Sequence, residues 1–164
     1  MRFFLLFTLS TFTLFSQPQS HSIGLSASRS RLDYYASLDY GLQVKSMHFR
    51  AGLAIGVNRV MLQSTFSPKL LLCLGRDLLP SDRWIIAPSL YYTNQVLFIH
   101  PSIPTTYWQE ALTGVAVAYG RKFQMTADFK GGWIGEFYKS RSLQKYQLAH
   151  GWGYDLSIGI RYVF

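Results

Sequence analysis

The last fourteen residues, 151 to 164, read GWGYDLSIGIRYVF and alternate between bulky apolar residues and small or charged ones. The odd-numbered positions, which form one parity, carry glycine, serine, Asp155 and Arg161. Val163 is the exception, because it is a large apolar residue at an odd-numbered position. Successive side chains of a β-strand point to opposite faces, so a period of two predicts a strand. The bulky parity consists of Trp152, Tyr154, Leu156, Ile158, Ile160, Tyr162 and Phe164. We therefore predict a terminal strand with one large apolar face and one face of small or charged residues.

The same alternation recurs in four other segments, beginning at residues 34, 48, 112 and 123. Together with less regular segments they predict eight strands, at 23–31, 34–43, 48–61, 69–75, 83–93, 108–119, 123–138 and 150–164. An even number places both termini at one end, beside the short links 44–47, 76–82 and 120–122. The longer links 62–68, 94–107 and 139–149 then lie at the other end. The predicted fold is an all-β, closed, antiparallel, up-and-down transmembrane β-barrel.

Three features fit this pattern less well. The run Lys69 to Leu74 is apolar on both parities, which leaves its faces unassigned. Pro88 removes a ladder donor inside the fifth strand, where a bulge is plausible. The segment 95–100 either extends a strand or forms an additional one that would change the count.

The distribution of charge favours a membrane barrel over a soluble one. A soluble barrel fills its interior with large apolar side chains and carries Lys and Glu outside, whereas neither parity is rich in charge here. Aromatic residues favour the strand ends, as in interfacial girdles: Tyr34, Trp84, Tyr92, Trp108, Tyr119, Phe137, Trp152 and Tyr162. A soluble lipocalin-like binder stays open as an alternative, because strand periodicity alone does not exclude it.

Composition and the N-terminus suggest an exported single domain. The chain has 164 residues, of which 49% are hydrophobic and 15% charged, and its only cysteine is Cys73. Arg2 and the apolar stretch 3–15 are typical of a signal peptide, too short to span a bilayer. We predict cleavage after Ser16, with Ser22 as the alternative, and a barrel domain over 23–164.

With these features in place, the C-terminus resembles a known family. Tyr162, Val163 and Phe164, preceded by Tyr154, Leu156, Ile158 and Ile160, are similar to the C-terminal signal of outer-membrane proteins. The resemblance is to small barrels of the outer-membrane protein A and X type, and it covers about residues 23 to 164. It implies location in the bacterial outer membrane and the barrel-assembly machinery as a partner during biogenesis. No loop motif or catalytic signature identifies a subfamily.

The inward parity provides the candidate site. Four acids and three bases share it on five strands, namely Asp39, Arg50, Asp128, Lys130, Glu136, Asp155 and Arg161. Buried charges are tolerated when they are paired, so we predict a network of ion pairs that plugs the lumen. A gated ion path or a binding site is the alternative.

The sequence contains few features that indicate enzyme activity, cofactor binding or nucleic-acid binding. His48, His100 and His150 lie on scattered segments, with Ser140 and Ser142 near the last two, and no spacing marks a nucleophile and base. We expect no enzyme activity, cofactor or metal. The sixteen Lys and Arg against eight acids give +8 without a basic stripe, which argues against nucleic acid. A set of basic residues near the longer links is predicted to contact lipopolysaccharide, namely Arg29, Arg31, Lys139, Arg141 and Lys145.

Two classes of function remain open. One is a structural or interaction barrel that presents outer loops to a protein partner or an envelope component. The other is a barrel that transports solutes or handles lipid or lipopolysaccharide. Fold alone does not decide between them, because one barrel architecture hosts many tasks.

Overall fold

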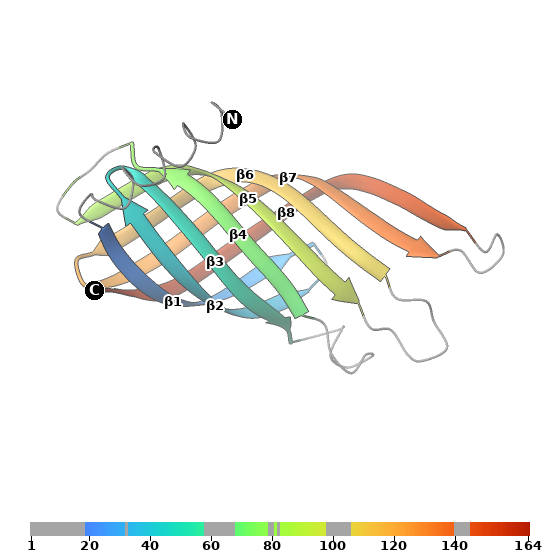
Figure 1. The fold of residues 1–164 in the computed structure, drawn as a ribbon, viewed down its shortest axis with the longest axis horizontal. Coiled ribbons are helices and arrows are strands. Elements are labelled where there is room, and N and C mark those ends of the chain that lie inside the picture. Colours follow the sequence, from blue (N-terminus) through green and yellow to red (C-terminus); the bar gives the residue numbers. More distant parts are fainter. Residues whose placement is uncertain are drawn as a thin grey trace, which may run out of the picture.

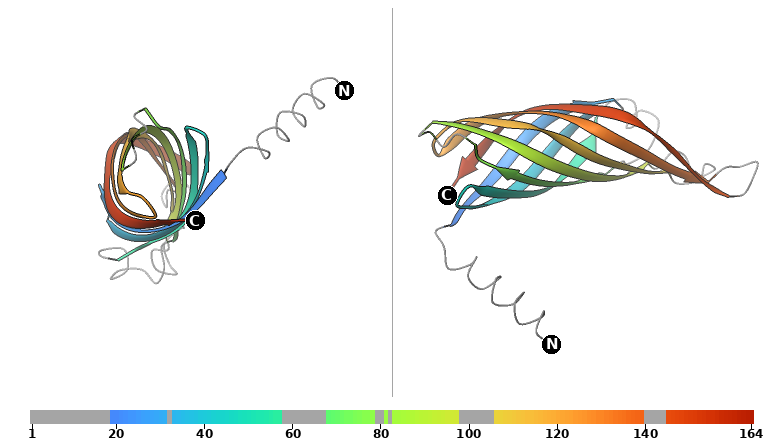
Figure 2. Two further views of the ribbon diagram at one scale, coloured as in Figure 1. Left: turned by 90° about the vertical axis from the view of Figure 1, so that its left-hand side faces the viewer. Right: turned by 90° about the horizontal axis from the view of Figure 1, so that it is seen from above.

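The structure, a computed structural model, describes residues 19–31, 33–57, 68–78, 81, 83–97, 106–139 and 145–164. These residues form a closed barrel of eight antiparallel strands in chain order, which confirms the predicted fold class (Figures 1 and 2). The strands are β1 (Gln19–Ser30), β2 (Tyr34–Val44), β3 (Met47–Gly56), β4 (Pro68–Arg76), β5 (Trp84–Leu97), β6 (Thr106–Gly120), β7 (Phe123–Lys139) and β8 (Tyr146–Val163). Within the described ranges no helix has the length and hydropathy needed to cross a membrane.

The register of the strands sets the width and tilt of the barrel. A path through directly paired residues leaves β1 at Ser20 and returns to β1 at Ser30, a shift of ten residues (30 − 20). Its steps between them are Gln43, His48, Gly75, Ser89, Gly114, Lys130 and Asp155. A shift of ten over eight strands corresponds to a strand tilt of about 40° and an interior that side chains can fill.

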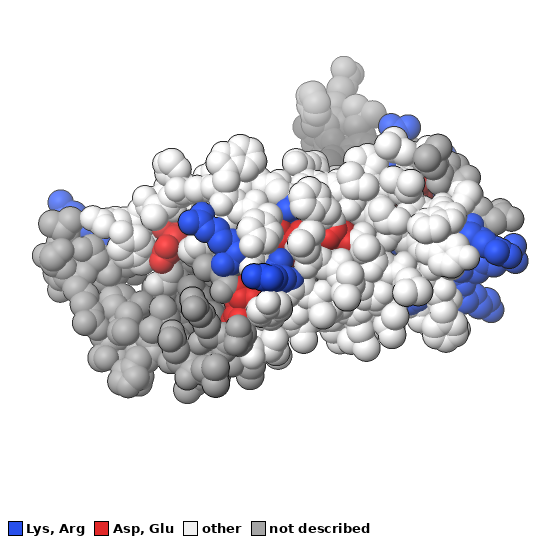
Figure 3. Space-filling view, turned by 180° about the vertical axis from the view of Figure 1, so that it is seen from behind, with Lys and Arg blue, Asp and Glu red and all other residues white. Residues whose placement is uncertain are grey.

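The two faces of the strands differ as the alternation predicted. Trp152 is 80% exposed and Ile158 70%, whereas Asp155 and Ser157 on the other parity are buried. In β4, whose faces the sequence left unassigned, Lys69 is buried and its neighbour Leu70 is exposed. In the space-filling view, uncharged side chains cover the barrel between its middle and its right-hand end, and basic side chains gather at that end (Figure 3). That end is the one where the C-terminus lies. Acidic and basic side chains are also visible near the middle of the view.

The end that holds the C-terminus is closed by short connections. Lys45 and Ser46 make the β2–β3 turn, where Lys45 has a φ of 54°. Gly120 has a φ of 127°, a backbone conformation that favours glycine, and it leads into the β6–β7 link of Arg121 and Lys122. The C-terminal residue Phe164 exchanges both backbone hydrogen bonds with His21 of β1, at 2.8 and 3.0 Å.

At the opposite end, β4 to β8 are longer than predicted, whereas β2 begins where it was predicted and β1 ends one residue early. β5 continues to Leu97, so residues 95–97 extend a strand and form no additional one. β6 begins at Thr106 and β8 at Tyr146, two and four residues before their predicted starts. β3 ends at Gly56, and the remainder of its predicted range, from 58 onward, lies outside the described residues.

Two local predictions were wrong. No bulge forms at Pro88, because the β5–β6 register runs without a break from Trp84 to Leu97. The β4–β5 pairing stops at Ser89, so the missing N–H of Pro88 removes no bond from that ladder. Trp108 is not part of a girdle, because it shares the inward parity of Glu110 and its indole nitrogen is buried.

Candidate functional site

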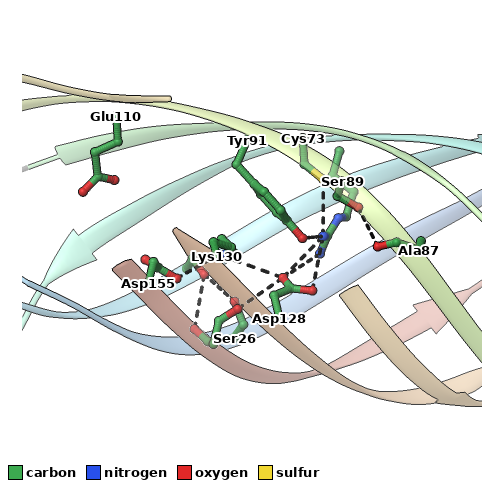
Figure 4. A network of polar contacts seen from close by, with 12 residues as sticks. Ser26, Cys73, Ala87, Ser89, Tyr91, Glu110, Asp128, Lys130 and Asp155 are labelled. Carbon is green, nitrogen blue, oxygen red and sulfur yellow. Dashed lines mark hydrogen bonds and ion pairs between the residues drawn. The ribbon is translucent and has the colours of Figure 1, made fainter. Parts of the chain in front are cut away.

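The lumen holds charged side chains that follow one another with alternating sign. Figure 4 labels four of them, Asp128, Lys130, Asp155 and Glu110. The series runs from Arg50 through Asp128, Lys130, Asp155 and Lys69 to Glu110. These residues belong to five strands, β3, β4, β6, β7 and β8, and each neighbouring pair lies within 4.0 Å. Every charge in the series therefore has an opposite charge beside it, as a buried charge requires.

Arg50 forms the part of the series nearest the C-terminal end. Its guanidinium donates to both oxygens of Asp128 at 3.3 to 3.4 Å, and its Nη2 also reaches the hydroxyl of Tyr91 at 3.2 Å. Ser157 donates to Asp128 at 3.1 Å. Asp128 is thus held from several directions, which fixes the orientation of its carboxylate.

Lys130 carries the series toward the longer links. Its Nζ donates to Asp155 Oδ1 at 2.8 Å and lies 4.7 Å from the centre of the Tyr91 ring. The aromatic face adds a cation–π interaction to the ion pair. Tyr91 therefore contacts both cations of the inner part of the network, because Arg50 lies 5.7 Å from the same ring centre.

The most deeply buried part joins Lys69 and Glu110. The two side chains are each 1% exposed, and Nζ lies 2.6 Å from Oε2. Thr93 donates to the same Glu110 oxygen at 2.6 Å, and the Tyr35 ring centre lies 4.6 Å from Nζ. Tyr35 in turn donates to Gln95 at 2.9 Å. Polar and charged groups thus fill the lumen at this level with almost no access for water.

The structure brings together four of the seven predicted lumen charges, namely Arg50, Asp128, Lys130 and Asp155. The other three, Asp39, Arg161 and Glu136, are half-buried on the same face of their strands. Asp39 lines a lumen cavity together with Arg50, and Arg161 lines another.

Lys69 and Glu110 were not among the predicted lumen charges. Lys69 lies in the strand whose faces were unassigned, although its charge marks the inward face, since lipid disfavours lysine. Glu110 shares the parity of Leu112, Gly114 and Ala118, which is the signal that identifies it.

Two small cavities lie among the described residues of the lumen. One, of about 40 Å³, is lined by His48, Arg50 and Arg161, and the other, of about 50 Å³, by Asp39, Arg50 and Lys130. Each has room for only a few water molecules. Arg50 and Asp128 line both of them, so this ion pair lies between the two cavities.

One group near the C-terminal end has the connectivity of a serine hydrolase triad. Ser89 Oγ lies 3.4 Å from Nε2 of His48, whose Nδ1 lies 3.2 Å from Asp77. Ser89 is 5% exposed and the neighbouring cavity admits only water, so the arrangement gives no room for a substrate. Gln43 donates to Asp77 at 2.9 Å, so hydrogen bonds link the group to β2 as well.

Other predicted residues are not gathered into a site. His150 is exposed on β8, whereas His100, Ser140 and Ser142 lie outside the described residues. Over the described ranges, no three His, Cys, Asp or Glu side chains are grouped to hold a metal ion.

The predicted lipopolysaccharide contacts lie at the end with the longer links. Arg29, Arg31 and Lys145 are exposed there. Lys139 is described only as the last residue of β7, and Arg141 lies outside the description. Contact with lipopolysaccharide stays a prediction.

Comparisons with known proteins identify the architecture. No protein-family model matches the chain, and no curated protein matches it. Its structure is similar to the N-terminal β-barrel domain of Pseudomonas aeruginosa OprF, with a TM-score of 0.61 at 12% identity over 88% of this chain and 97% of that one. The fold is that of a small outer-membrane β-barrel.

Two further solved structures are similar. A major outer membrane protein of Thermus thermophilus has a TM-score of 0.51 at 12% identity, over 90% of this chain and 100% of that one. Neisserial surface protein A has a TM-score of 0.45 at 14% identity, over 88% and 94%. The likeness to the first two barrels establishes the fold, and at such identities it carries no information about a ligand.

Proposed function

We propose that the small barrel is a non-enzymatic outer-membrane protein with a closed lumen, which acts as a rigid scaffold for interactions at its outer end. The observation that carries this proposal is the ion-paired filling of the lumen, above all the Lys69–Glu110 pair, whose side chains are each 1% exposed. An interior filled in this way holds the strands together and leaves no wide path for solutes.

The orientation follows from the connections. In single-chain bacterial barrels, both termini and the short turns face the periplasm. The small barrel would therefore place Lys45, Arg121 and Phe164 at the periplasmic side and its longer links outside. As part of the same proposal, the barrel-assembly machinery reads the terminal strand, with Phe164 as its last residue, after a signal peptide has directed export.

A belt of exposed apolar side chains supports the membrane location. Leu38, Leu53, Phe129 and Ile158 are 55 to 70% exposed on four different strands. In water such a surface would be an aggregation hazard, whereas in a bilayer it contacts acyl chains. Near the periplasmic end, Trp84 packs against Tyr119 with ring centres 4.6 Å apart, which suits an interfacial girdle.

Purified, detergent-folded protein tests both parts of the proposal. A folded barrel should migrate at a different apparent mass before and after boiling. Reconstituted in planar bilayers, it should show no stable conductance on the nanosiemens scale. A boiling-independent band from a water-soluble fraction would contradict the membrane barrel, and a persistent large conductance from heat-modifiable protein would contradict the closed lumen.

A further inference from the structure

Among the residues that the structure describes, the outer part of β8 has a neighbouring strand on only one of its two sides. β7 pairs with β8 along its length, from Tyr146 to Tyr162. β1 pairs only with the part from Asp155 to Val163, because β1 ends at Ser30. Over the described residues, positions 146–154 therefore form the edge of a sheet that projects beyond the β1–β2 hairpin (Figure 1).

The hydrogen-bond alternation shows which backbone groups face this edge. Phe164 bonds to His21 of β1, whereas the N–H of Val163 donates to Lys122 on the β7 side. Backbone groups of successive residues point to opposite sides of an antiparallel strand. The even-numbered residues thus turn their N–H and C=O groups toward the open side, namely Tyr146, Leu148, His150, Trp152 and Tyr154. The Trp152 carbonyl shows this directly, since it accepts a bond from Arg31 Nη1 at 3.1 Å.

The same residues carry an apolar outer face. Tyr146 is 72% exposed, Leu148 51% and Trp152 80%. With a rise of about 3.3 Å per residue and a tilt of about 40°, the 12 residues of β1 cover roughly 30 Å, about the height of the lipid belt. The nine edge residues continue roughly 20 Å beyond it. The edge then stands in water, where an open apolar strand is a template for pairing.

The charges around the edge determine the kind of partner. Arg29, Arg31 and Lys145 are exposed near it, and the guanidinium of Arg31 lies on the edge itself. The nearby carboxylate of Asp155 points into the lumen and is paired with Lys130. A second copy of the chain would bring these cations against one another, and like charges across a pair of strands are destabilising.

We propose that the outer edge of β8, residues 146–154, is a docking site for an extended acidic peptide segment of a partner protein. The segment adds as a strand antiparallel to β8, with its backbone bonded to the even-numbered residues and its carboxylates beside Arg31 and Lys145. Apolar side chains on its outer face continue the row formed by Tyr146, Leu148 and Trp152. This site deepens the proposed scaffold role and depends on the outer end standing clear of the membrane.

Synthetic nine-residue peptides test the site. One alternates valine with glutamate, and its match alternates valine with lysine. Detergent-folded barrel should bind the glutamate peptide at least tenfold more tightly, as measured by fluorescence anisotropy. Leu148→Pro removes one edge-facing N–H without touching the β7 ladder and should weaken binding about tenfold. Arg31→Glu should invert the preference in favour of the lysine peptide, whereas Lys122→Glu, at the other end of the barrel, should leave it unchanged.

The possible outcomes separate the site from its alternatives. If neither peptide binds while lipopolysaccharide vesicles bind in an Arg31-dependent and Leu148→Pro-insensitive manner, the surface recognises headgroups and the proposal is wrong. If the protein dimerises at micromolar concentration and Leu148→Pro abolishes the dimer, the occupant is a second copy and the proposal is equally wrong. The change in electrophoretic mobility on boiling shows whether each variant is folded. If the folded barrel binds no peptide, the docking site is wrong but the proposed scaffold function is not contradicted.

Discussion

Lys69 is a charged side chain that is almost completely buried in the lumen. Its ammonium depends on Glu110 at 2.6 Å, on Asp155 at 3.9 Å and on the ring of Tyr35. Removing one partner of a buried pair leaves an uncompensated charge, which costs about 3 to 5 kcal/mol, whereas removing both charges is often close to neutral. The energetic role of this pair therefore differs sharply between single and double substitutions.

We expect Lys69→Met to lower the free energy of unfolding by about 3 to 5 kcal/mol, because Glu110 is left buried without its cation. The double variant Lys69→Met with Glu110→Gln should recover most of that loss, since the amide oxygen still accepts from Thr93. Urea unfolding in detergent micelles, followed by tryptophan fluorescence, measures both. Lys145→Met, at an exposed position, is the control and should change stability by less than about 0.5 kcal/mol. Equal effects of Lys69→Met and Lys145→Met would contradict a dry, ion-paired lumen.

The contacts between individual residues were the part of the structure that the sequence predicted least well. The alternation assigned Arg50, Asp128, Lys130 and Asp155 to the inward face, and the structure places them there in ion pairs. Which acid meets which base depends on the register between strands distant in sequence, and alternation within a strand carries no information on that. For this reason the hydrogen-bonded group of His48, Asp77 and Ser89 was not predicted.

At the scale of the strand, β8 combines two environments along one backbone. Ile158 is 70% exposed and pairs directly with Ala27 of β1 and Ala127 of β7, far from both ends of the belt. Its neighbour Ser157 is 7% exposed in the lumen. In a membrane barrel the Ile158 side chain contacts lipid, whereas in a soluble barrel it contacts water. A charged substitution at this position therefore distinguishes the two kinds of barrel.

We expect Ile158→Arg to destabilise the barrel in lipid vesicles by about 2 to 4 kcal/mol, the cost of arginine near the bilayer midplane. Phe123→Arg serves as the matched control, because Phe123 is 77% exposed but follows the turn residue Lys122, where the cost falls to about 0 to 1 kcal/mol. Denaturant unfolding from vesicles measures both values. If Ile158→Arg cost no more than Phe123→Arg, that face would be in contact with water and the lipocalin-like alternative would return.

The prediction of the strands themselves was most accurate at the C-terminal-end turns and least accurate at the opposite end. Turns such as Lys45-Ser46 interrupt the alternation sharply, so the neighbouring bounds are off by no more than one residue. At the other end, β5 to β8 continue through polar residues of the kind that is typical of loops, for example Asn94 and Gln95 in β5. Those residues remain paired because their neighbours continue beside them, and a single strand's sequence does not contain that information.

For the whole molecule, closure is the property on which the proposed function depends. An eight-stranded sheet that failed to join β1 to β8 would expose two edges in lipid, where unsatisfied backbone groups are costly. The structure joins them in a register that pairs Ser28 with Ser157. Since Phe164 and His21 exchange both backbone bonds, Ser28 and Ser157 form a non-hydrogen-bonded pair, whose Cα atoms lie about 4.5 Å apart.

This spacing makes the closing seam directly testable, because disulfides form across Cα separations of about 4.4 to 6.8 Å. In a Cys73→Ser background, Ser28→Cys with Ser157→Cys should form a disulfide in most folded molecules on mild oxidation, seen as a reducible mobility shift after boiling. Ser22→Cys with Ser157→Cys uses the same strands and the same face but lies six residues out of register, about 20 Å apart, and should not cross-link. Cross-linking of the second pair, or of neither pair in heat-modifiable protein, would mean that β1 and β8 meet in another register or not at all. The ten-residue shift that sets the width of the lumen, and with it the fit of the charge network, would then be wrong as well.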